Sequence, residues 1–168
     1  MEVKKIYFDM DGVLADFARG LEELCRIEPL PQELATREYK EKMYAAMREV
    51  PHFYGKLEMM PGAMELFRPL YARYGSRCEI LSGVPKPHRG IPEAGEDKTE
   101  WVHRLLAPDL KVNITFKELK YLLAEDRGCI LIDDYERNIR EWEEAGGTGI
   151  LHRSTEGTLA RLRELGVL

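Results

Sequence analysis

Short apolar runs alternate along the chain with longer segments in which apolar residues recur every three or four positions. The short runs predict β-strands, and the longer segments predict amphipathic helices. The predicted strands cover residues 3–9, 77–82, 111–115, 129–133 and 148–152. The predicted helices cover residues 63–74, 98–106, 116–125, 138–145 and 155–165. This alternation predicts an α/β fold with a five-stranded parallel sheet, right-handed crossovers and helices on both faces.

One segment interrupts the alternation. Residues 19–57 carry two helix-like stretches, separated by Pro29 and Pro31, with no strand between them. Because this segment follows the first strand directly, we expect it to form a small helical cap over the strand ends. The catalytic core would then comprise residues 1–18 and 58–168. An ordinary pair of packing helices is the alternative.

Composition narrows the class of protein. A chain of 168 residues with 44% hydrophobic residues suffices for one domain with a core and a small insertion. The net charge of -5 is spread over mixed-sign segments, which argues against binding to nucleic acid polymers or anionic membranes. No apolar run approaches a membrane span, and the start of the chain enters a strand pattern directly, so we expect a cytoplasmic protein. The three cysteines lie far apart and predict reduced thiols.

Two pairs of acidic residues mark the ends of predicted strands. Asp9 and Asp11 end the first apolar run, and Gly12 predicts a turn just past the edge where open parallel sheets bind ligands. Asp133 and Asp134 end the fourth run. Four carboxylates at one edge would repel each other, so we expect a hard divalent cation, most naturally Mg²⁺. Taken alone, Asp9 could equally be a turn or helix-cap residue.

Other residues at these strand ends suit a phosphate group. The second strand closes with Ser82 and Gly83, whose hydroxyl and amide could donate hydrogen bonds to a phosphate oxygen. Lys98, at the start of the following helix, is expected to meet both an attacking carboxylate and the phosphate. Lys117 and Lys120 follow the third strand and rank second for this position, and a solvated lysine is the alternative for any one of them.

Together these segments resemble a known family. The motifs DMDGV, LSG, DKTEWV and LIDDYERNI occur in this order at the predicted strand ends. They look like the four motifs of the haloacid dehalogenase (HAD) superfamily of phosphohydrolases, which implies a three-layer, Rossmann-like core. The first motif, the helical insert and the stretch FYGKLEMMPGAMELFRPL resemble the 5'(3')-deoxyribonucleotidases within that superfamily.

The resemblance implies a role for each acidic residue. Asp9 would be the nucleophile that forms an aspartyl-phosphate, and Asp11 would act as acid and then base. Mg²⁺ would be held by the carboxylates of Asp9 and Asp134 and by the backbone carbonyl of Asp11. Asp133 would lie behind them, although Asp133 and Asp134 could exchange places. Asp11 also favours phosphoryl transfer to water over the carbon chemistry of the dehalogenases.

The implied activity is hydrolysis of a small phosphate monoester, with a nucleoside monophosphate as the substrate. Phe17 matches a phenylalanine that packs against the base in the deoxyribonucleotidases, and Phe53 or Tyr54 would supply another ring; core packing is the alternative for Phe53. The insert departs from that family because it carries no tryptophan, and Tyr135 stands where the mammalian enzymes have an arginine.

Other functions remain open at this point. A sugar-phosphate phosphatase or a phosphomutase would use the same core, because the same covalent intermediate can pass its phosphate to a sugar hydroxyl. A non-catalytic binding module on the HAD scaffold is a further alternative. A small cap leaves the site partly open, so a homodimer could complete the pocket.

Overall fold

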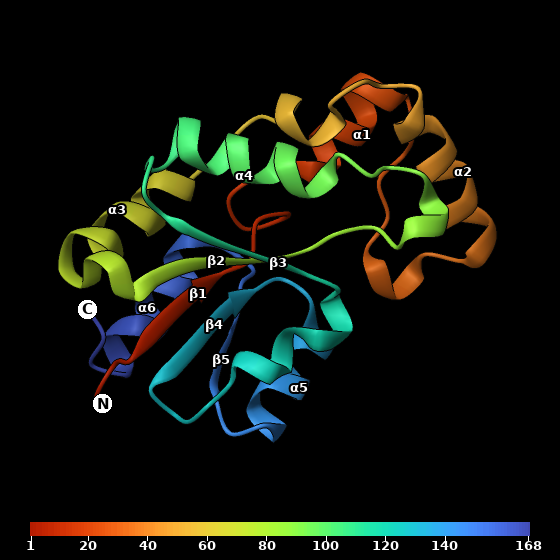
Figure 1. Ribbon diagram of the computed structural model, residues 1–168. Helices are drawn as coiled ribbons and strands as arrows, with labels where there is room; N and C mark the ends of the chain where they lie inside the picture. Colours follow the sequence, from red (N-terminus) through yellow and green to blue (C-terminus); the bar gives the residue numbers. More distant parts are fainter.

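Five parallel strands form one sheet in the order β3-β2-β1-β4-β5 in the computed structural model, which describes residues 1–168 (Figure 1). The first strand of the chain therefore lies in the middle of the sheet, between β2 and β4. The strands are β1 Lys5–Phe8, β2 Cys78–Gly83, β3 Lys111–Thr115, β4 Cys129–Asp133 and β5 Thr148–Leu151. The predicted five-stranded parallel sheet is confirmed.

Six α-helices and five short 3₁₀ helices connect the strands. The α-helices are α1 Phe17–Cys25, α2 Arg37–Arg48, α3 Ala63–Tyr74, α4 Ala94–Leu105, α5 Glu136–Glu144 and α6 Thr155–Glu164. The 3₁₀ helices are η1 Gln32–Leu34, η2 Phe53–Lys56, η3 Gly75–Arg77, η4 Pro87–Arg89 and η5 Lys117–Leu123. The amphipathic helix predicted over residues 116–125 is shorter in the structure and is the 3₁₀ helix η5 rather than an α-helix. None of the helices has the length and apolar character needed to span a lipid bilayer.

Both faces of the sheet are covered, as predicted. Alternating strand residues point to opposite faces, so Ile6 and Phe8 join a large hydrophobic cluster with residues of α3, α4 and α6. Tyr7 points the other way and packs in a smaller cluster with Ile139 and Trp142 of α5. Figure 1 shows α3 and α6 on one side of the sheet and α5 on the other.

Residues 17–56 lie beyond the carboxyl ends of the strands, where Figure 1 shows α1 and α2. The side chains of Asp16 and Thr36 cap the two helices by accepting hydrogen bonds from the backbone amides of Arg19 and Tyr39. Buried residues of this segment, including Leu21 and Met47, belong to the same large cluster as the sheet. The division into a core and a cap at residues 19–57 stays a prediction.

Candidate active site

The first strand ends in a tight turn at the carboxyl edge of the sheet. The amide of Asp9 still donates to the carbonyl of Ile132 at 2.9 Å, so β4 fixes the position of Asp9. Gly12 has a φ of 84°, which side chains disfavour, and a Cβ built there would lie 2.1 Å from Oδ2 of Asp134. Glycine therefore turns the chain, as predicted, and also makes room for Asp134.

Three carboxylates converge at this edge. Asp9, Asp133 and Asp134 each offer an oxygen, and these oxygens lie within 4.8 Å of one another. Burial and the charge of Asp133 raise the pKa of Asp9 well above its ordinary value. The same two causes raise the pKa of Asp134 to about 6. The protein alone therefore does not balance this negative charge, and a cation among the three oxygens would favour their ionised forms.

The two aspartates after β4 differ in their hydrogen bonds. Oδ2 of Asp133 accepts from Nζ of Lys120 at 2.8 Å and from Nδ2 of Asn138 at 3.1 Å. Its Oδ1 accepts from the amide of Tyr135 at 2.8 Å. By contrast, Oδ1 of Asp134 is buried and has no hydrogen-bond partner. Asp134 therefore has a carboxylate oxygen available to bind a ligand, whereas both oxygens of Asp133 accept hydrogen bonds from the protein.

The cluster fits a divalent cation. It consists of carboxylate oxygens, which hard cations such as Mg²⁺ and Ca²⁺ prefer, and one of these oxygens is buried without a partner. The backbone carbonyl of Asp11 lies in the adjoining turn and accepts none of the backbone hydrogen bonds. A metal ion is therefore consistent with the donors that the chain brings together.

Lys120 pairs with the candidate nucleophile. Its side chain is buried, and its Nζ lies 2.8 Å from Oδ1 of Asp9 and 2.8 Å from Oδ2 of Asp133. Burial alone would lower the pKa of Lys120, but the charges of Asp9 and Asp133 outweigh it and raise the pKa. We had expected Lys98 to meet the attacking carboxylate, and this expectation is wrong. Lys120, which ranked second from the sequence, takes that place.

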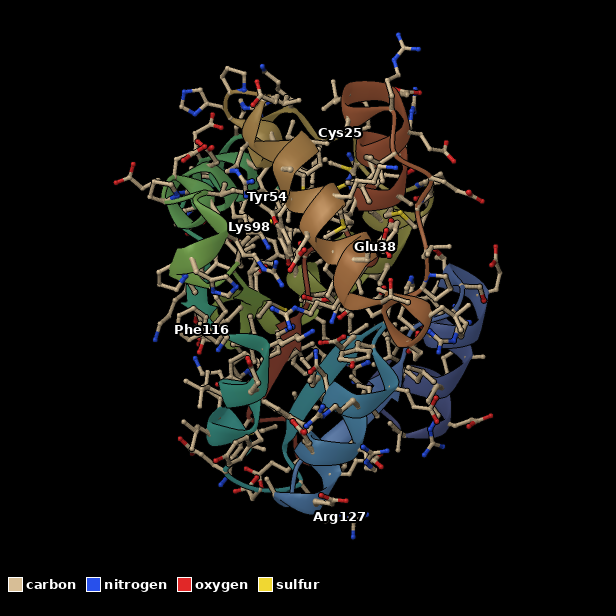
Figure 2. All side chains as sticks on the ribbon, turned by 90° about the vertical axis from the view of Figure 1, so that its right-hand side faces the viewer. Cys25, Glu38, Tyr54, Lys98, Phe116 and Arg127 are labelled. Carbon is tan, nitrogen blue, oxygen red and sulfur yellow. The ribbon has the colours of Figure 1, made fainter.

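Lys98 instead pairs with the second aspartate of the first motif. Its Nζ donates to Oδ2 of Asp11 at 2.8 Å, to Oγ of Ser82 at 2.9 Å and to the carbonyl of Gly83 at 2.6 Å. The ammonium group also lies 4.5 Å from the ring centre of Tyr54, and Figure 2 shows the two side chains next to each other. Lys98 thus links the end of β2 to Asp11. The other carboxylate oxygen of Asp11 is buried without a partner.

The predicted aromatic residues lie together near Lys98. The ring of Phe17 is 5.7 Å from that of Phe53 and 6.2 Å from that of Tyr54. Phe53 is 1% exposed and belongs to the hydrophobic core, which is the packing position that we considered as the alternative. Tyr54 is also buried, whereas Phe17 is half-buried and keeps a free surface.

Asn138 was not anticipated from the sequence. It lies in the first turn of α5, is 6% exposed, and donates to Asp133. The available signal was an amide five residues after Asp133, on the inner face of an amphipathic helix. That spacing brings the side chain back towards the strand end from which the helix begins.

The fold is that of solved structures of hydrolases of the HAD superfamily. The solved structure of a HAD-superfamily hydrolase from Ehrlichia chaffeensis aligns over 98% of each chain, with a TM-score of 0.57 and 13% identity. A HAD family enzyme from Bacteroides thetaiotaomicron, solved as a magnesium complex, aligns over 90% of this chain and 94% of its own, with a TM-score of 0.51 and 15% identity.

The chain belongs to the family described as 5' nucleotidase, deoxy (pyrimidine), cytosolic type C protein, whose model matches residues 2–158. The cytosolic-type 5'(3')-deoxyribonucleotidase of Homo sapiens is 31% identical over 157 residues, which cover 83% of this chain and 74% of the relative. The family suggested by the sequence motifs is confirmed.

Proposed function

We propose that the protein is a magnesium-dependent phosphomonoesterase that hydrolyses deoxyribonucleoside monophosphates through an aspartyl-phosphate. The convergence of Asp9, Asp133 and Asp134 in a chain of this family carries the proposal, because a nucleophilic carboxylate and the ligands of a divalent cation would then lie side by side. The relatives named 5'(3')-deoxyribonucleotidases support the nucleotide substrate, and the cytosolic-type human relative supports a cytoplasmic location.

The two aspartates of the first motif divide the chemistry between them. Asp9 attacks the phosphorus atom, so that a bond forms from its carboxylate oxygen while the bond to the ester oxygen breaks. Asp11 donates its proton to the departing alkoxide. Asp11 then takes a proton from water, and the water oxygen attacks phosphorus and releases Asp9. The products are an alcohol and inorganic phosphate.

The residues around Asp9 and Asp11 position these groups. A bound Mg²⁺, held by Asp9, Asp134 and the carbonyl of Asp11, would neutralise the phosphoryl oxygens. Lys120 holds the Asp9 carboxylate in place. Phosphate entering beside the end of β2 would contact the Gly83 amide and compete with Asp11 for Lys98.

The hydrogen bonds of Ser82 are compatible with a phosphate group bound beside the end of β2. Its Oγ accepts a hydrogen bond from Lys98 and donates only a long one, of 3.5 Å, to the carbonyl of Gly83, so the hydroxyl proton could turn to a phosphate oxygen. A buried lysine and a buried hydroxyl that already contact each other form a preorganised anion site. Phe17, with its free surface, and Tyr54 would border the substrate's base.

The test is a panel of phosphate monoesters, including deoxyribonucleotides phosphorylated at either end, assayed with magnesium and with a chelator. We expect magnesium-dependent hydrolysis that Asp9→Asn abolishes. Asp126→Asn is a matched control, because it makes the same change at an exposed ion pair with Lys4. Hydrolysis of an aryl phosphate by Asp9→Asn in magnesium buffer would show that the nucleophile is misassigned.

A further inference from the structure

A histidine with an uncommon backbone conformation lies just before η2, at the end of the segment that covers the strand ends. His52 has a φ of 54° and a ψ of 42°, which place it in the left-handed region. Residues with a Cβ rarely adopt this conformation, and asparagine and aspartate tolerate it best after glycine. Such strain persists where the surrounding structure holds the residue in place. We therefore expect a contact that fixes His52.

That contact comes from the first turn of α4. Nδ1 of His52 lies 2.9 Å from Oδ1 of Asp97. The histidine side chain is 69% exposed, whereas that of Asp97 is only 14% exposed. The other carboxylate oxygen of Asp97 is buried and has no hydrogen-bond partner. Burying a carboxylate is costly unless it is paired, so His52 supplies the bond that compensates for the burial of Asp97.

The neighbouring residues extend this contact into the candidate active site. Lys98 follows Asp97, and Tyr54 lies two positions after His52. Nζ of Lys98 is 4.5 Å from the ring centre of Tyr54, and the two side chains lie together in Figure 2. Two adjacent contacts thus join the same two segments. The outer one is the ion pair of His52, and the inner one includes the lysine that donates to Asp11.

The two segments are held in place to different degrees. α4 is anchored in the core by Trp101, which is fully buried. By contrast, η2 is a 3₁₀ helix of four residues that includes Gly55, and such helices have poor hydrogen-bond geometry. Arg104 donates to the carbonyl of Gly55 at 2.9 Å, and Trp101 donates to that of Leu57 at 2.8 Å. Side chains of α4 therefore fix η2, and the contact with His52 fixes the end at which η2 begins.

We propose that His52 and Asp97 are positioning residues, which hold the ring of Tyr54 beside the substrate's base at a fixed distance from the lysine that binds its phosphate. They act through Tyr54 and Lys98 and do not contact the substrate themselves. Because a fixed distance matters only for a substrate that carries a base, the pair favours nucleotides over phosphate esters without one. This inference rests on the proposed phosphomonoesterase activity and assigns part of its specificity.

The experiment compares kcat/KM for a deoxyribonucleoside 5'-monophosphate with that for deoxyribose 5-phosphate, which lacks the base. Asp97→Ala and His52→Gly each remove the contact, and glycine also relieves the strain of the left-handed conformation. We expect the ratio of the two kcat/KM values to fall by about two- to fivefold in each variant, which corresponds to the loss of an exposed ion pair. The fall should come from a higher KM for the nucleotide, with little change in kcat.

Two further variants serve as controls. His52→Asn should keep the wild-type ratio, because asparagine tolerates the left-handed region and carries an amide nitrogen on Cγ, where histidine carries Nδ1. This nitrogen can donate to Asp97. Glu96→Ala removes an exposed carboxylate from the same turn of α4 and should also keep the ratio.

The outcomes separate the two proposals. A wild-type ratio in both Asp97→Ala and His52→Gly would overturn the positioning role and leave the phosphomonoesterase activity intact. If neither compound is hydrolysed, the activity is refuted, and calorimetry with the same two compounds decides about the pair. Tighter binding of the nucleotide that weakens in Asp97→Ala would support the positioning role, whereas an unchanged preference or absent binding would overturn it.

Discussion

Replacing Lys120 by methionine tests the electrostatic balance of the site. Methionine keeps an unbranched side chain but removes the charge that lies 2.8 Å from both Asp9 and Asp133. Removing one partner from a buried ion pair costs about 3–5 kcal/mol. Asp9 can take up a proton, since its pKa is already raised, so we expect the lower end of this range.

The change is measurable by urea unfolding in the presence of a chelator. With a denaturant slope of about 2 kcal/mol per molar urea, a loss of about 3 kcal/mol lowers the midpoint by about 1.5 M. Magnesium should stabilise Lys120→Met more than the wild type, because the ion would neutralise the same carboxylates. Lys42→Met, at an exposed lysine without an ion pair, should change the free energy of unfolding by less than about 0.5 kcal/mol.

A double variant protects this test against simple misfolding. Asp133→Asn in the Lys120→Met background removes one of the two carboxylates that Lys120 contacts and should recover part of the lost stability. A midpoint for Lys120→Met within about 0.3 M of the wild type would refute the reasoning, because that corresponds to under about 1 kcal/mol.

Two further predictions concern the turn after β1 and the end of β5. Gly12→Ala should push Asp134 aside and remove the magnesium-dependent rise in melting temperature. Gly146→Ala is the control, because Gly146 also has a positive φ but no atom lies within 4 Å of its Cβ position; this variant should keep the magnesium-dependent rise. His152 is buried, its Nδ1 lies 2.7 Å from Oγ1 of Thr158, and burial, followed by the charge of Arg153, lowers its pKa below the ordinary 6.5. As the pH falls, His152 therefore takes up a proton more readily in the unfolded chain than in the folded protein, so it should lower the free energy of unfolding below pH 6.5. Urea titrations between pH 7.5 and 5, with a chelator present, should show a smaller loss of stability for His152→Gln than for the wild type. Identical pH profiles for the two proteins would contradict this prediction.

Much of the fold could be predicted from the sequence because buried parallel strands leave a strong pattern. A strand covered on both faces reads as a short apolar run, and four of the five runs contain a whole strand of the sheet, while the run at 77–82 covers β2 except for Gly83. The helix over residues 63–74 was also predicted at its observed bounds, Ala63–Tyr74. Hydrophobic periodicity is reliable where burial decides the structure.

Residues 117–123 show where periodicity fails. The sequence contains good helix formers and an apolar spacing that suits an α-helix, yet the segment folds as the 3₁₀ helix η5. Lys120 points inwards to two carboxylates, while Leu119 and Leu122 are exposed. The ion pairs of Lys120 thus outweigh the burial of these two leucines. One of the pairs, between Lys120 and Asp9, joins residues more than 100 positions apart in the chain.

For the same reason, the sequence could not assign each lysine to its carboxylate. It placed Asp9, Asp133 and Asp134 at one edge, because the carboxyl ends of parallel strands meet there. Whether Lys98 or Lys120 reaches Asp9 depends on how α4 and η5 lie over that edge. Local spacing carries no information about this.

The central position of β1 has a consequence for how the protein is made. β1 leaves the ribosome before the other four strands of the sheet, and it pairs on one side with β2 and on the other with β4, whose pairing residues are numbered 129–132. Until that late segment and the two residues after it emerge, Asp9 lacks Asp133 and Asp134, and one edge of β1 is unpaired. An unfinished chain would expose an apolar strand edge and be prone to aggregation. The site and the middle of the sheet are thus completed in one late step, so nascent chains that stop before β4 should have neither a metal site nor a stable sheet.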